Sequence, residues 1–326
     1  MNTTTTHIVR IEKPGGPEVL KYQEAELSVP GPGEVLIAQK AMGVNFLDLF
    51  FRNGTFPMPS YPGPVGLEAA GVIDAVGDEV VSFNIGDRVA YYASSGAYAE
   101  KRLIKADEIF RLPDDITFEQ AAAVMIKGLT ARMLLKHSHS AKPGEVVLIH
   151  AMTGGVGTLL GAWARYLGAT VIGTVGSAAK KQLALLRGYE HVIDLQSEDL
   201  SKAVTAITGG KGIDVVYDGV GQATFGRSVA LVKPGGNAVL YGWASGMPGF
   251  EGLEKEHSDV HFVRAVLNHD PDYQDRSGKG LADIFELIRK GVFYLEEPAV
   301  YALRDAAKAH ADLESRKTTG SILLKP

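Results

Sequence analysis

The chain has 326 residues, of which 45% are hydrophobic and 22% charged, and its formal net charge is −5 at pH 7. This composition is typical of a soluble enzyme with room for two domains, and the weak negative charge argues against nucleic acid as a main partner. The sequence contains no cysteine, which excludes disulfides, thiolate nucleophiles and cysteine-ligated zinc sites.

Two further features concern membranes and export. No uninterrupted apolar stretch reaches the roughly 18 residues that a membrane span needs. Residues 1–7 have neither the basic start nor the apolar core of a signal peptide. We therefore expect a cytoplasmic protein with no membrane partner.

The first third of the chain consists of short apolar segments separated by glycine and proline turns, a pattern typical of antiparallel strands. The expected strands cover residues 7–11, 20–26, 34–43, 65–76, 86–92 and 97–104. An antiparallel, barrel-like domain is the simplest interpretation of this part.

From Thr117 the pattern changes to helix and then to alternating strands and helices. Thr117 can cap a helix over residues 120–135, either as one helix or as two that meet near Gly128. Strands are then expected at residues 146–150, 170–175, 192–194, 214–218 and 238–241, with helices at 158–167, 178–186, 199–208 and 224–231. This alternation predicts an α/β domain with a doubly wound parallel sheet.

The last part of the chain no longer alternates regularly. Helices are expected at residues 281–290 and 306–315, and a strand at 321–324 should rejoin the first domain. The sequence therefore predicts a catalytic domain at 1–126, a dinucleotide-binding domain at 127–268 and a return segment at 269–326 that completes the catalytic domain.

A glycine turn joins the first strand of the parallel sheet to its helix. Residues 146–157 read V-V-L-I-H-A-M-T-G-G-V-G, so Gly154 and Gly157 occupy the second and third positions of the G-x-G-x-x-G fingerprint, while Met152 stands at the first. Many tight strand-to-helix turns bind nothing. Where such a turn binds a dinucleotide, its backbone, here Gly154, Gly155, Val156 and Gly157, approaches the pyrophosphate.

The next strand indicates which dinucleotide is preferred. It ends at Gly176 and Ser177, followed by Lys180 and Lys181, and no acidic residue lies between Gly157 and Glu190. An NAD site places an acid there for the ribose 2′-hydroxyl, whereas a 2′-phosphate needs small polar groups and a cation. The lysines can be a solvated helix start, but cations there oppose the helix dipole, which favours an anionic ligand. We therefore predict NADPH.

Glycine-rich segments also follow the later strands. Gly219 and Gly221 come after one strand, and Gly242 to Gly246, which include Ser245, come after the next. Ligands of doubly wound sheets bind at the carboxyl ends of the strands. We therefore count Gly219, Gly242 and Ser245 among the cofactor-binding residues.

Several motifs in this order resemble those of the zinc-independent medium-chain dehydrogenase/reductase superfamily, and within it the quinone oxidoreductases of the zeta-crystallin type. The motifs are G-G-P-E-V-L at 15–20, G-V-N-F-L-D at 43–48, G-L-E-A-A-G at 66–71, G-D-R-V at 86–89, G-A-Y-A-E at 96–100, K-G-L-T-A at 127–131, Y-D-G-V-G at 217–221 and L-E-S-R at 313–316. The resemblance implies a GroES-like antiparallel β-barrel catalytic domain beside the Rossmann domain, and a homodimer.

The resemblance also implies site residues. It places Asn45 and Thr130 near the nicotinamide of NADPH, and Gly173, Ser177 and Lys180 around the adenosine phosphate. Arg264 and Arg316 are implied as further cofactor contacts.

No metal site is expected. The zinc-dependent relatives carry G-H-E, where this chain has Gly66-Leu67-Glu68. His257 and His261 are four residues apart and can share a helix face, but they lack the H-E-x-x-H pattern and a third ligand. Without a Lewis acid, acceptors that take hydride readily are favoured, such as quinones and conjugated carbonyls.

Phe50 and Phe56 stand where the family often has tyrosines. With Phe46 they can form an apolar slot for an aromatic acceptor, and we include Phe50 and Phe56 with Asn45 and Thr130 among the candidate catalytic residues. The alternative is that these rings only pack the core. For Asp48, Tyr98 and Lys127 we favour structural roles, namely a helix cap, a strand-edge contact and an ion pair at a domain junction.

Three functions remain open from the sequence. The leading hypothesis is an NADPH-dependent quinone oxidoreductase that uses direct hydride transfer. The rival within the same class is a reductase of 2-alkenals or enones. The rival from another class is an NADPH-binding protein with little catalysis, either crystallin-like or binding nucleic-acid elements, a hypothesis to which the missing tyrosines lend weight.

Overall fold

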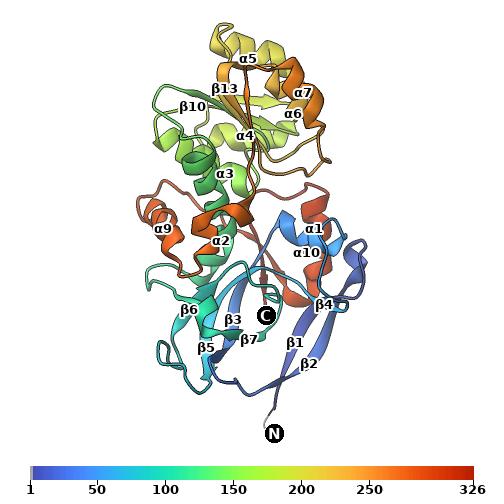
Figure 1. Cartoon of the computed structure of the whole chain (residues 1–326), viewed down its shortest axis with the longest axis vertical. Coiled ribbons are helices and arrows are strands. Elements are labelled where there is room, and N and C mark those ends of the chain that lie inside the picture. The colour runs from blue at the N-terminus through green and yellow to red at the C-terminus, as the bar shows by residue number, and fades with distance from the viewer. Residues whose placement is uncertain (1–2) are drawn as a thin grey trace. The chain divides into compact units, whose positions relative to one another are not determined.

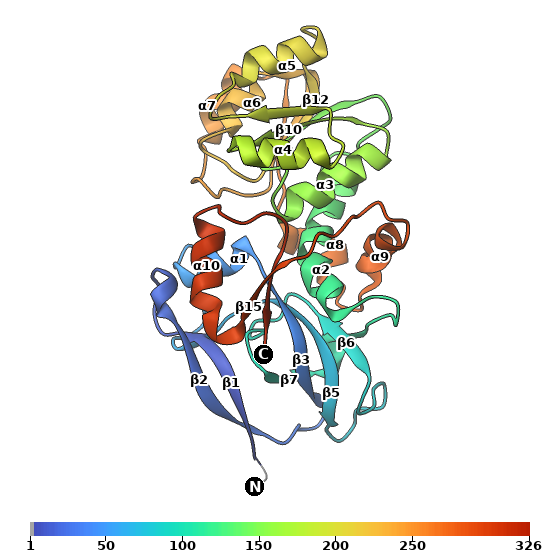
Figure 2. The ribbon, with the colours of Figure 1, turned by 180° about the vertical axis from the view of Figure 1, so that it is seen from behind.

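The computed structural model describes residues 3–326 (Figure 1; Figure 2 gives the view from behind). The chain divides into two compact units. The β unit comprises the described residues through Lys127 together with Pro271–Glu286 and Leu295–Pro326, and the Rossmann unit comprises Gly128–Asp270 and Leu287–Tyr294. Residues 287–294 therefore group with the Rossmann unit, although they fall inside the predicted return segment.

The β unit contains two sheets that are largely antiparallel. A three-stranded sheet has the order β2-β1-β4, and a seven-stranded sheet has the order β15-β16-β3-β5-β6-β8, with β7 also paired to β3. The strands are β1 (Thr3–Ile11), β2 (Leu20–Ser28), β3 (Glu34–Val44), β4 (Gly63–Pro64), β5 (Glu68–Val76), β6 (Arg88–Tyr91), β7 (Lys101–Lys105), β8 (Phe110–Arg111), β15 (Ala299–Ala302) and β16 (Ile322–Lys325). Because β16 pairs with β3, the expected return of the chain end to the first domain is confirmed.

Apolar residues of these strands build the core of the β unit. Val35 and Ile37 of β3 are completely buried, as are Val89 and Tyr91 of β6. The helical elements of this part are η1 (Pro17–Val19), α1 (Phe46–Arg52), η2 (Ala106–Glu108), α8 (Pro271–Gln274), η5 (Lys279–Leu281), η6 (Leu303–Asp305) and α10 (Ala306–Glu314). Helix α9 (Ala282–Arg289) begins in this unit, and its residues from Leu287 onward group with the Rossmann unit. Helix α10 packs beside α1, as both views show (Figures 1 and 2).

The Rossmann unit is a parallel six-stranded sheet with the order β11-β10-β9-β12-β13-β14. Its strands are β9 (Val146–Ile149), β10 (Thr170–Val175), β11 (His191–Asp194), β12 (Ile213–Asp218), β13 (Val232–Leu240) and β14 (His261–Arg264). Its helices are α3 (Gly155–Tyr166), α4 (Ala178–Leu186), α5 (Leu200–Thr208), α6 (Phe225–Val229), α7 (Phe250–Glu256) and η4 (Leu267–His269). The predicted doubly wound sheet is confirmed, and its strand order reverses between β9 and β12, where such sheets bind ligands.

Helix α2 (Phe118–Met133) is continuous and is followed by a π-helical turn, η3 (Leu134–Ser138). The alternative of two helices that meet near Gly128 is therefore wrong. Gly128 is buried inside α2, and packing on all sides offsets the roughly 1 kcal/mol that glycine costs in a helix. Among the described residues, no helix has both the length and the apolar character needed to cross a membrane.

The two histidines considered as a helical pair are also placed differently. Helix α7 ends at Glu256 and His257 is its C-cap, while His261 begins strand β14. The two side chains therefore do not share a helix face, because the helix stops between them.

Candidate active site

The glycine turn between β9 and α3 is tightly folded. Ala151 has a left-handed backbone with φ of 52°, and the amide of Gly154 donates to the carbonyl of Ala151 at 2.9 Å. A Cβ on Gly157 would overlap that same carbonyl, so only glycine lets the first turn of α3 come this close to the strand. Gly154 is the N-cap residue, and Gly155 and Val156 begin the helix. The first amides of a helix have no carbonyl partner inside it, which makes this turn suitable for a phosphate.

Met152, at the first position of the fingerprint, is explained by Gly173. Met152 is completely buried, and its amide donates to the carbonyl of Thr174 at 3.1 Å. A Cβ on Gly173 of β10 would overlap the sulfur of Met152. The thioether thus fills the space that the missing side chain of Gly173 leaves, so Gly173 has a packing role beside its implied role at the adenosine phosphate.

Ser177 and the two lysines lie where β10 leads into α4. Ser177 is the N-cap of α4, and its hydroxyl accepts from the amide of Lys180 at 3.4 Å. Lys181 Nζ forms an ion pair with Glu198 Oε1 at 2.7 Å. The charge of Lys181 is thus largely balanced within the protein.

The segments that follow β12 and β13 lie against each other. The carboxylate of Asp218 accepts from the amides of Val220 at 2.7 Å and Gly221 at 2.9 Å. The hydroxyl of Ser245 donates to the carbonyl of Val220 at 2.7 Å. A Cβ on Gly242 would lie 2.9 Å from the carbonyl oxygen of Gly219. Gly219, Gly242 and Ser245 are therefore together, and the hydroxyl of Ser245 serves the loop itself.

The remaining cofactor candidates are distributed over both units. Thr130 is buried in the part of α2 that belongs to the Rossmann unit. Arg264 ends β14, and its guanidinium lies over the ring of Phe250, 4.9 Å from the ring centre. Arg316 follows α10 in the β unit and has a left-handed backbone with φ of 59°.

In the β unit, two buried acids hold Asn45, the residue that precedes α1. The backbone amide of Asn45 donates to Asp48 Oδ2 at 2.8 Å, and its side-chain Nδ2 donates to Glu68 Oε1 at 2.7 Å. Lys127 Nζ lies 3.3 Å from the same oxygen of Glu68. The predicted capping role of Asp48 and the predicted ion pair of Lys127 are thus both confirmed.

Asp48 also belongs to a buried chain of polar groups. The hydroxyl of Tyr98 lies 3.2 Å from Asp48 Oδ2 and 3.0 Å from His310 Nε2, which replaces the strand-edge role expected for Tyr98. Burial, together with the charge of Glu68, raises the pKa of Asp48 to about 7, although the hydrogen bond from the Asn45 amide acts in the opposite direction. Burial, with the Arg52 guanidinium nearby, lowers the pKa of His310 to about 3, so His310 is neutral at physiological pH.

The three phenylalanines lie together in the β unit. The ring of Phe50 meets that of Phe46 at 6.0 Å and that of Phe56 at 5.5 Å between centres, both in edge-to-face geometry. The amide of Phe56 donates to the carbonyl of Phe50 at 3.0 Å, which fixes the loop against α1. All three rings are partly exposed, so they form an aromatic surface that offers no hydroxyl.

Sequence reasoning missed Glu68 and His310 as members of this region. Glu68 enters the sequence analysis only as part of Gly66-Leu67-Glu68, where Leu67 replaces the histidine of the zinc motif, and the partners of Glu68 lie 23, 58 and 59 residues away. His310 is 212 residues from Tyr98 and falls in an ordinary helical pattern. The one local signal for Glu68 is an acidic residue within an apolar strand segment, since a carboxylate buried there needs partners.

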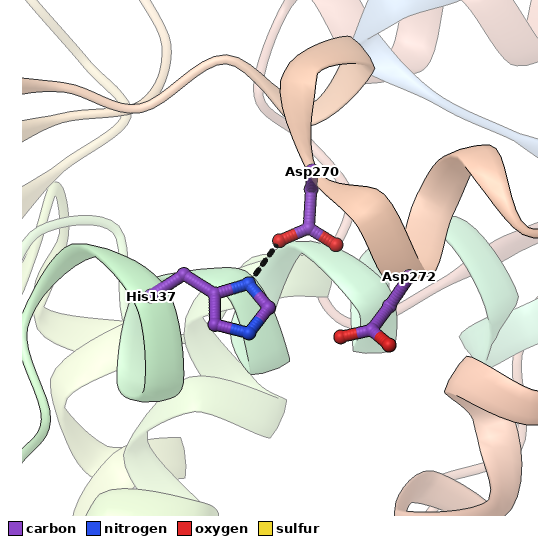
Figure 3. A group of neighbouring side chains, drawn as sticks. All are labelled: His137, Asp270 and Asp272. Carbon is purple, nitrogen blue, oxygen red and sulfur yellow. Dashed lines mark hydrogen bonds and ion pairs between the residues drawn. The ribbon is translucent and has the colours of Figure 1, made fainter.

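A separate acid–histidine pair lies in the Rossmann unit (Figure 3). His137 Nδ1 is 2.5 Å from the buried carboxylate of Asp270. The pair joins η3 to the end of η4, which identifies it as a structural contact. Asp272, also drawn in Figure 3, belongs to the β unit.

Comparison with known proteins agrees with this architecture. Residues 31–114 match the alcohol dehydrogenase GroES-like domain, and residues 155–267 match the zinc-binding dehydrogenase model. The quinone oxidoreductase of Pseudomonas aeruginosa is 41% identical over 96% of this chain and 97% of its own length. The 2-haloacrylate reductase of a Burkholderia species is 38% identical over 97% of this chain and 98% of its own length.

Among solved structures, the Escherichia coli quinone oxidoreductase in complex with NADPH superposes with a TM-score of 0.92 at 40% identity. The match covers 99% of this chain and 100% of that one. The order of the motifs, the two units and the full-length similarity lead to one assignment. The chain belongs to the quinone oxidoreductase family of the medium-chain dehydrogenases/reductases.

Proposed function

We propose that this protein is an NADPH-dependent quinone oxidoreductase that works without zinc. The observation that carries the proposal is the full-length similarity to quinone oxidoreductases, one of which is solved with NADPH, combined with the tight glycine turn. The turn supplies free helix amides beside strand ends that form the usual ligand edge of such a sheet. The substrate is a small molecule, namely a quinone or a similar conjugated carbonyl.

Different residues of the chain would bind different parts of NADPH. Gly154, Gly155, Val156 and Gly157 would hold the pyrophosphate, and Gly173, Ser177 and Lys180 the adenosine phosphate. The cofactor set is completed by Gly219, Gly242, Ser245, Arg264 and Arg316, with Asn45 and Thr130 for the nicotinamide end. Bound NADPH supplies the hydride, and the protein supplies orientation.

On the acceptor side, we assign Phe50 and Phe56 to stacking. Their edge-to-face arrangement with Phe46 presents an apolar surface without a hydroxyl. A flat aromatic ring can be held there by dispersion and by burial of apolar area. No proton donor comes from this cluster, which suits acceptors whose reduced oxygen takes its proton from water.

A reductase of conjugated alkenes is the second candidate, because a 2-haloacrylate reductase is nearly as similar to the chain as the quinone oxidoreductases. The two reactions differ in the atom that receives the hydride and in the need for a proton on carbon. A chain that places phenylalanines at the acceptor surface favours the quinone.

A steady-state assay separates the candidates. NADPH oxidation is followed with benzoquinone, naphthoquinone and a 2-alkenal, with product analysis for each. Faster turnover of a quinone supports the proposal, and faster consumption of the alkenal supports the second candidate. Tight NADPH binding with no turnover above background would instead support the binding-protein hypothesis.

We also propose a homodimer in the cytoplasm. The dimer is implied by the family resemblance and is testable by light scattering after size exclusion. Cell fractionation tests the location. We also assign residues 1–126 to the catalytic domain, 127–268 to the dinucleotide-binding domain and 269–326 to the return segment that completes the catalytic domain. Limited proteolysis tests these limits.

A further inference from the structure

Glu68, at the start of β5, is a completely buried carboxylate whose two oxygens are both engaged. Oε1 accepts from Asn45 Nδ2 at 2.7 Å and lies 3.3 Å from Lys127 Nζ. Oε2 accepts from the backbone amide of Ile126 at 2.8 Å. Two of these donors belong to α2, so the helix holds Glu68 in a single position.

The strand beside Glu68 is adapted to this carboxylate. Gly43 of β3 is its direct partner in the sheet. A Cβ on Gly43 would overlap both Glu68 Oε1 and the carbonyl of Ala122. Glycine at position 43 therefore provides the space in which the carboxylate sits, and no backbone strain is needed to explain it.

The chemistry of Glu68 determines how the Asn45 amide is turned. A carboxylate only accepts hydrogen bonds, and the carboxylate of Glu68 is paired with the ammonium of Lys127 at 3.3 Å. The NH₂ group of Asn45 must therefore face Glu68, because the reverse orientation would set two acceptors against each other. Asp48 fixes the backbone amide of the same residue. Asn45 is thus held at both its backbone and its side chain. Its Oδ1 faces away from Glu68 and toward the backbone amide of Asp48 in a capping box, and an amide oxygen has a second lone pair for another donor.

We propose that Glu68 is a positioning residue for hydride transfer: by fixing the Asn45 amide, it presents Oδ1 as the acceptor for a hydrogen-bond donor at the nicotinamide end of the cofactor. The inference rests on the proposed function, which places Asn45 there. Glu68 itself does not touch the cofactor, and it acts through Asn45. A carboxamide NH₂ or a ribose hydroxyl are the donors that such an oxygen can receive.

The test is a double-mutant cycle of Glu68→Gln and Asn45→Ala. A glutamine at position 68 has the same size but can donate as well as accept, so both amide orientations of Asn45 become accessible. We expect Glu68→Gln to lower kcat about 3–10-fold with little change in the quinone KM, as for loss of orientation. We expect no further loss when it is added to Asn45→Ala, because residues that act through one contact are not additive.

A readout independent of turnover is the fluorescence of bound NADPH, which reports the surroundings of the nicotinamide. We expect the emission of bound NADPH to change in Glu68→Gln and in Asn45→Ala. The matched control is Tyr91→Phe, which removes another buried hydrogen bond of the same sheet, to Gln39, and should lose stability without altering the emission. If Glu68→Gln does not fold, Glu68→Asp keeps the charge opposite Lys127 but withdraws it from Asn45, and should alter the emission in the same way.

The outcomes separate the two proposals. Additive losses in the cycle, or unchanged NADPH emission in a folded Glu68 variant, would overturn the positioning role and leave the proposed function intact. Absence of quinone turnover in the wild type would overturn the proposed function, while the emission comparison would still decide the role of Glu68. Absence of NADPH binding in the wild type would overturn both.

Discussion

At the scale of single residues, the chain shows how a glycine on a neighbouring strand accommodates a departure from a fingerprint. Met152 replaces the first glycine of the dinucleotide turn, and the neighbouring strand receives its side chain where Gly173 has none. The turn keeps its shape because the added volume lies in the core and not on the ligand side. A buried thioether adapts well to such irregular space.

Replacement of Gly173 by alanine should therefore destabilise the Rossmann unit. The new methyl group overlaps the sulfur of Met152, and overpacking of this kind costs about 1–3 kcal/mol. Urea denaturation followed by circular dichroism measures the loss. A second change, Met152→Ala, makes room and should recover part of the stability lost in Gly173→Ala. Equal stability of Gly173→Ala and wild type would show that the thioether is free to move.

Lys180 is the residue expected to read the 2′-phosphate. Lys180→Ala should weaken NADPH binding by about 1–3 kcal/mol, as for loss of a charge-assisted hydrogen bond, and change NADH binding much less. Lys181→Ala is the matched control, since its ammonium is paired with Glu198 at 2.7 Å. Titration of both cofactors by fluorescence measures the difference. Equal losses for NADPH and NADH in Lys180→Ala would exclude recognition of the 2′-phosphate.

At the scale of elements, helix α1 depends on groups far away in the sequence. Its first turn is held by Asp48, which is linked through Tyr98 to His310 of α10. Asp48 Oδ1 and His310 Nδ1 are buried and have no hydrogen-bond partner among the described residues. Burial therefore disfavours the charged form of each group. The pKa of Asp48 is raised and the pKa of His310 is lowered, so both changes favour the neutral side chain.

These two shifts affect stability in opposite directions. The pKa of Asp48 is raised to about 7 in the folded protein, so its contribution to the free energy of unfolding is present below about pH 4 and is lost as the pH rises to about 7. The pKa of His310 is lowered to about 3, so its contribution is present above about pH 6.5 and is lost as the pH falls toward 3. In the wild type, the free energy of unfolding therefore changes little between about pH 4 and pH 6.5, because the contributions of Asp48 and His310 have opposite pH dependence.

Single variants should reveal each slope. In Asp48→Asn only the histidine remains, so the free energy of unfolding should rise from pH 4.5 to pH 6.5 more steeply than in the wild type, by on the order of 2–4 kcal/mol. In His310→Gln only the acid remains, and the free energy of unfolding should fall over the same window relative to the wild type. Urea denaturation at several pH values tests this. Parallel pH curves for all three proteins would contradict it.

The aromatic surface allows a further test at the junction of α1 and its loop. Phe50 is fixed in α1 between two rings, so Phe50→Tyr should leave a poorly satisfied hydroxyl and raise the KM of bulky apolar quinones about 2–5-fold. Phe56 precedes Pro57 in a loop, and Phe56→Tyr should raise kcat for small quinones by donating to the developing oxyanion. Unchanged kcat and KM in both variants would place these rings outside the acceptor site.

At the scale of the whole molecule, patterns that are local in the sequence predicted the fold well. The parallel sheet followed from alternating strands and helices, and the glycine turn from four neighbouring residues. Contacts between distant residues were not predictable. The residues around Lys181 do not indicate its ion pair with Glu198. Those around Asn45 do not indicate its hydrogen bond to Glu68. Gly128 suggests a helix break in the sequence, but the helix continues through it because the residue is buried, which the local pattern does not reveal.

Cofactor binding should stabilise the whole chain by mass action. NADPH at 100 times its dissociation constant should add about 2.7 kcal/mol to the free energy of unfolding, because the glycine turn that would bind it exists only in the folded state. NADH at the same concentration should add less, since it lacks the 2′-phosphate. Thermal unfolding with each cofactor measures this, and an equal rise in Tm would argue against the NADPH preference.

The position of β16 has a consequence for synthesis on the ribosome. Strand β3 leaves the ribosome early, yet β16 pairs with it through Ile322, Leu323 and Leu324, and the residue paired with Gly43 is Leu323, 280 residues later (323 − 43). The Rossmann unit, almost all of it in Gly128–Asp270, emerges complete before that. The nascent chain must therefore carry an unpaired strand edge while its later unit folds. Such an edge invites association with other chains, so the newly made β unit is the stage at which a chaperone would matter most.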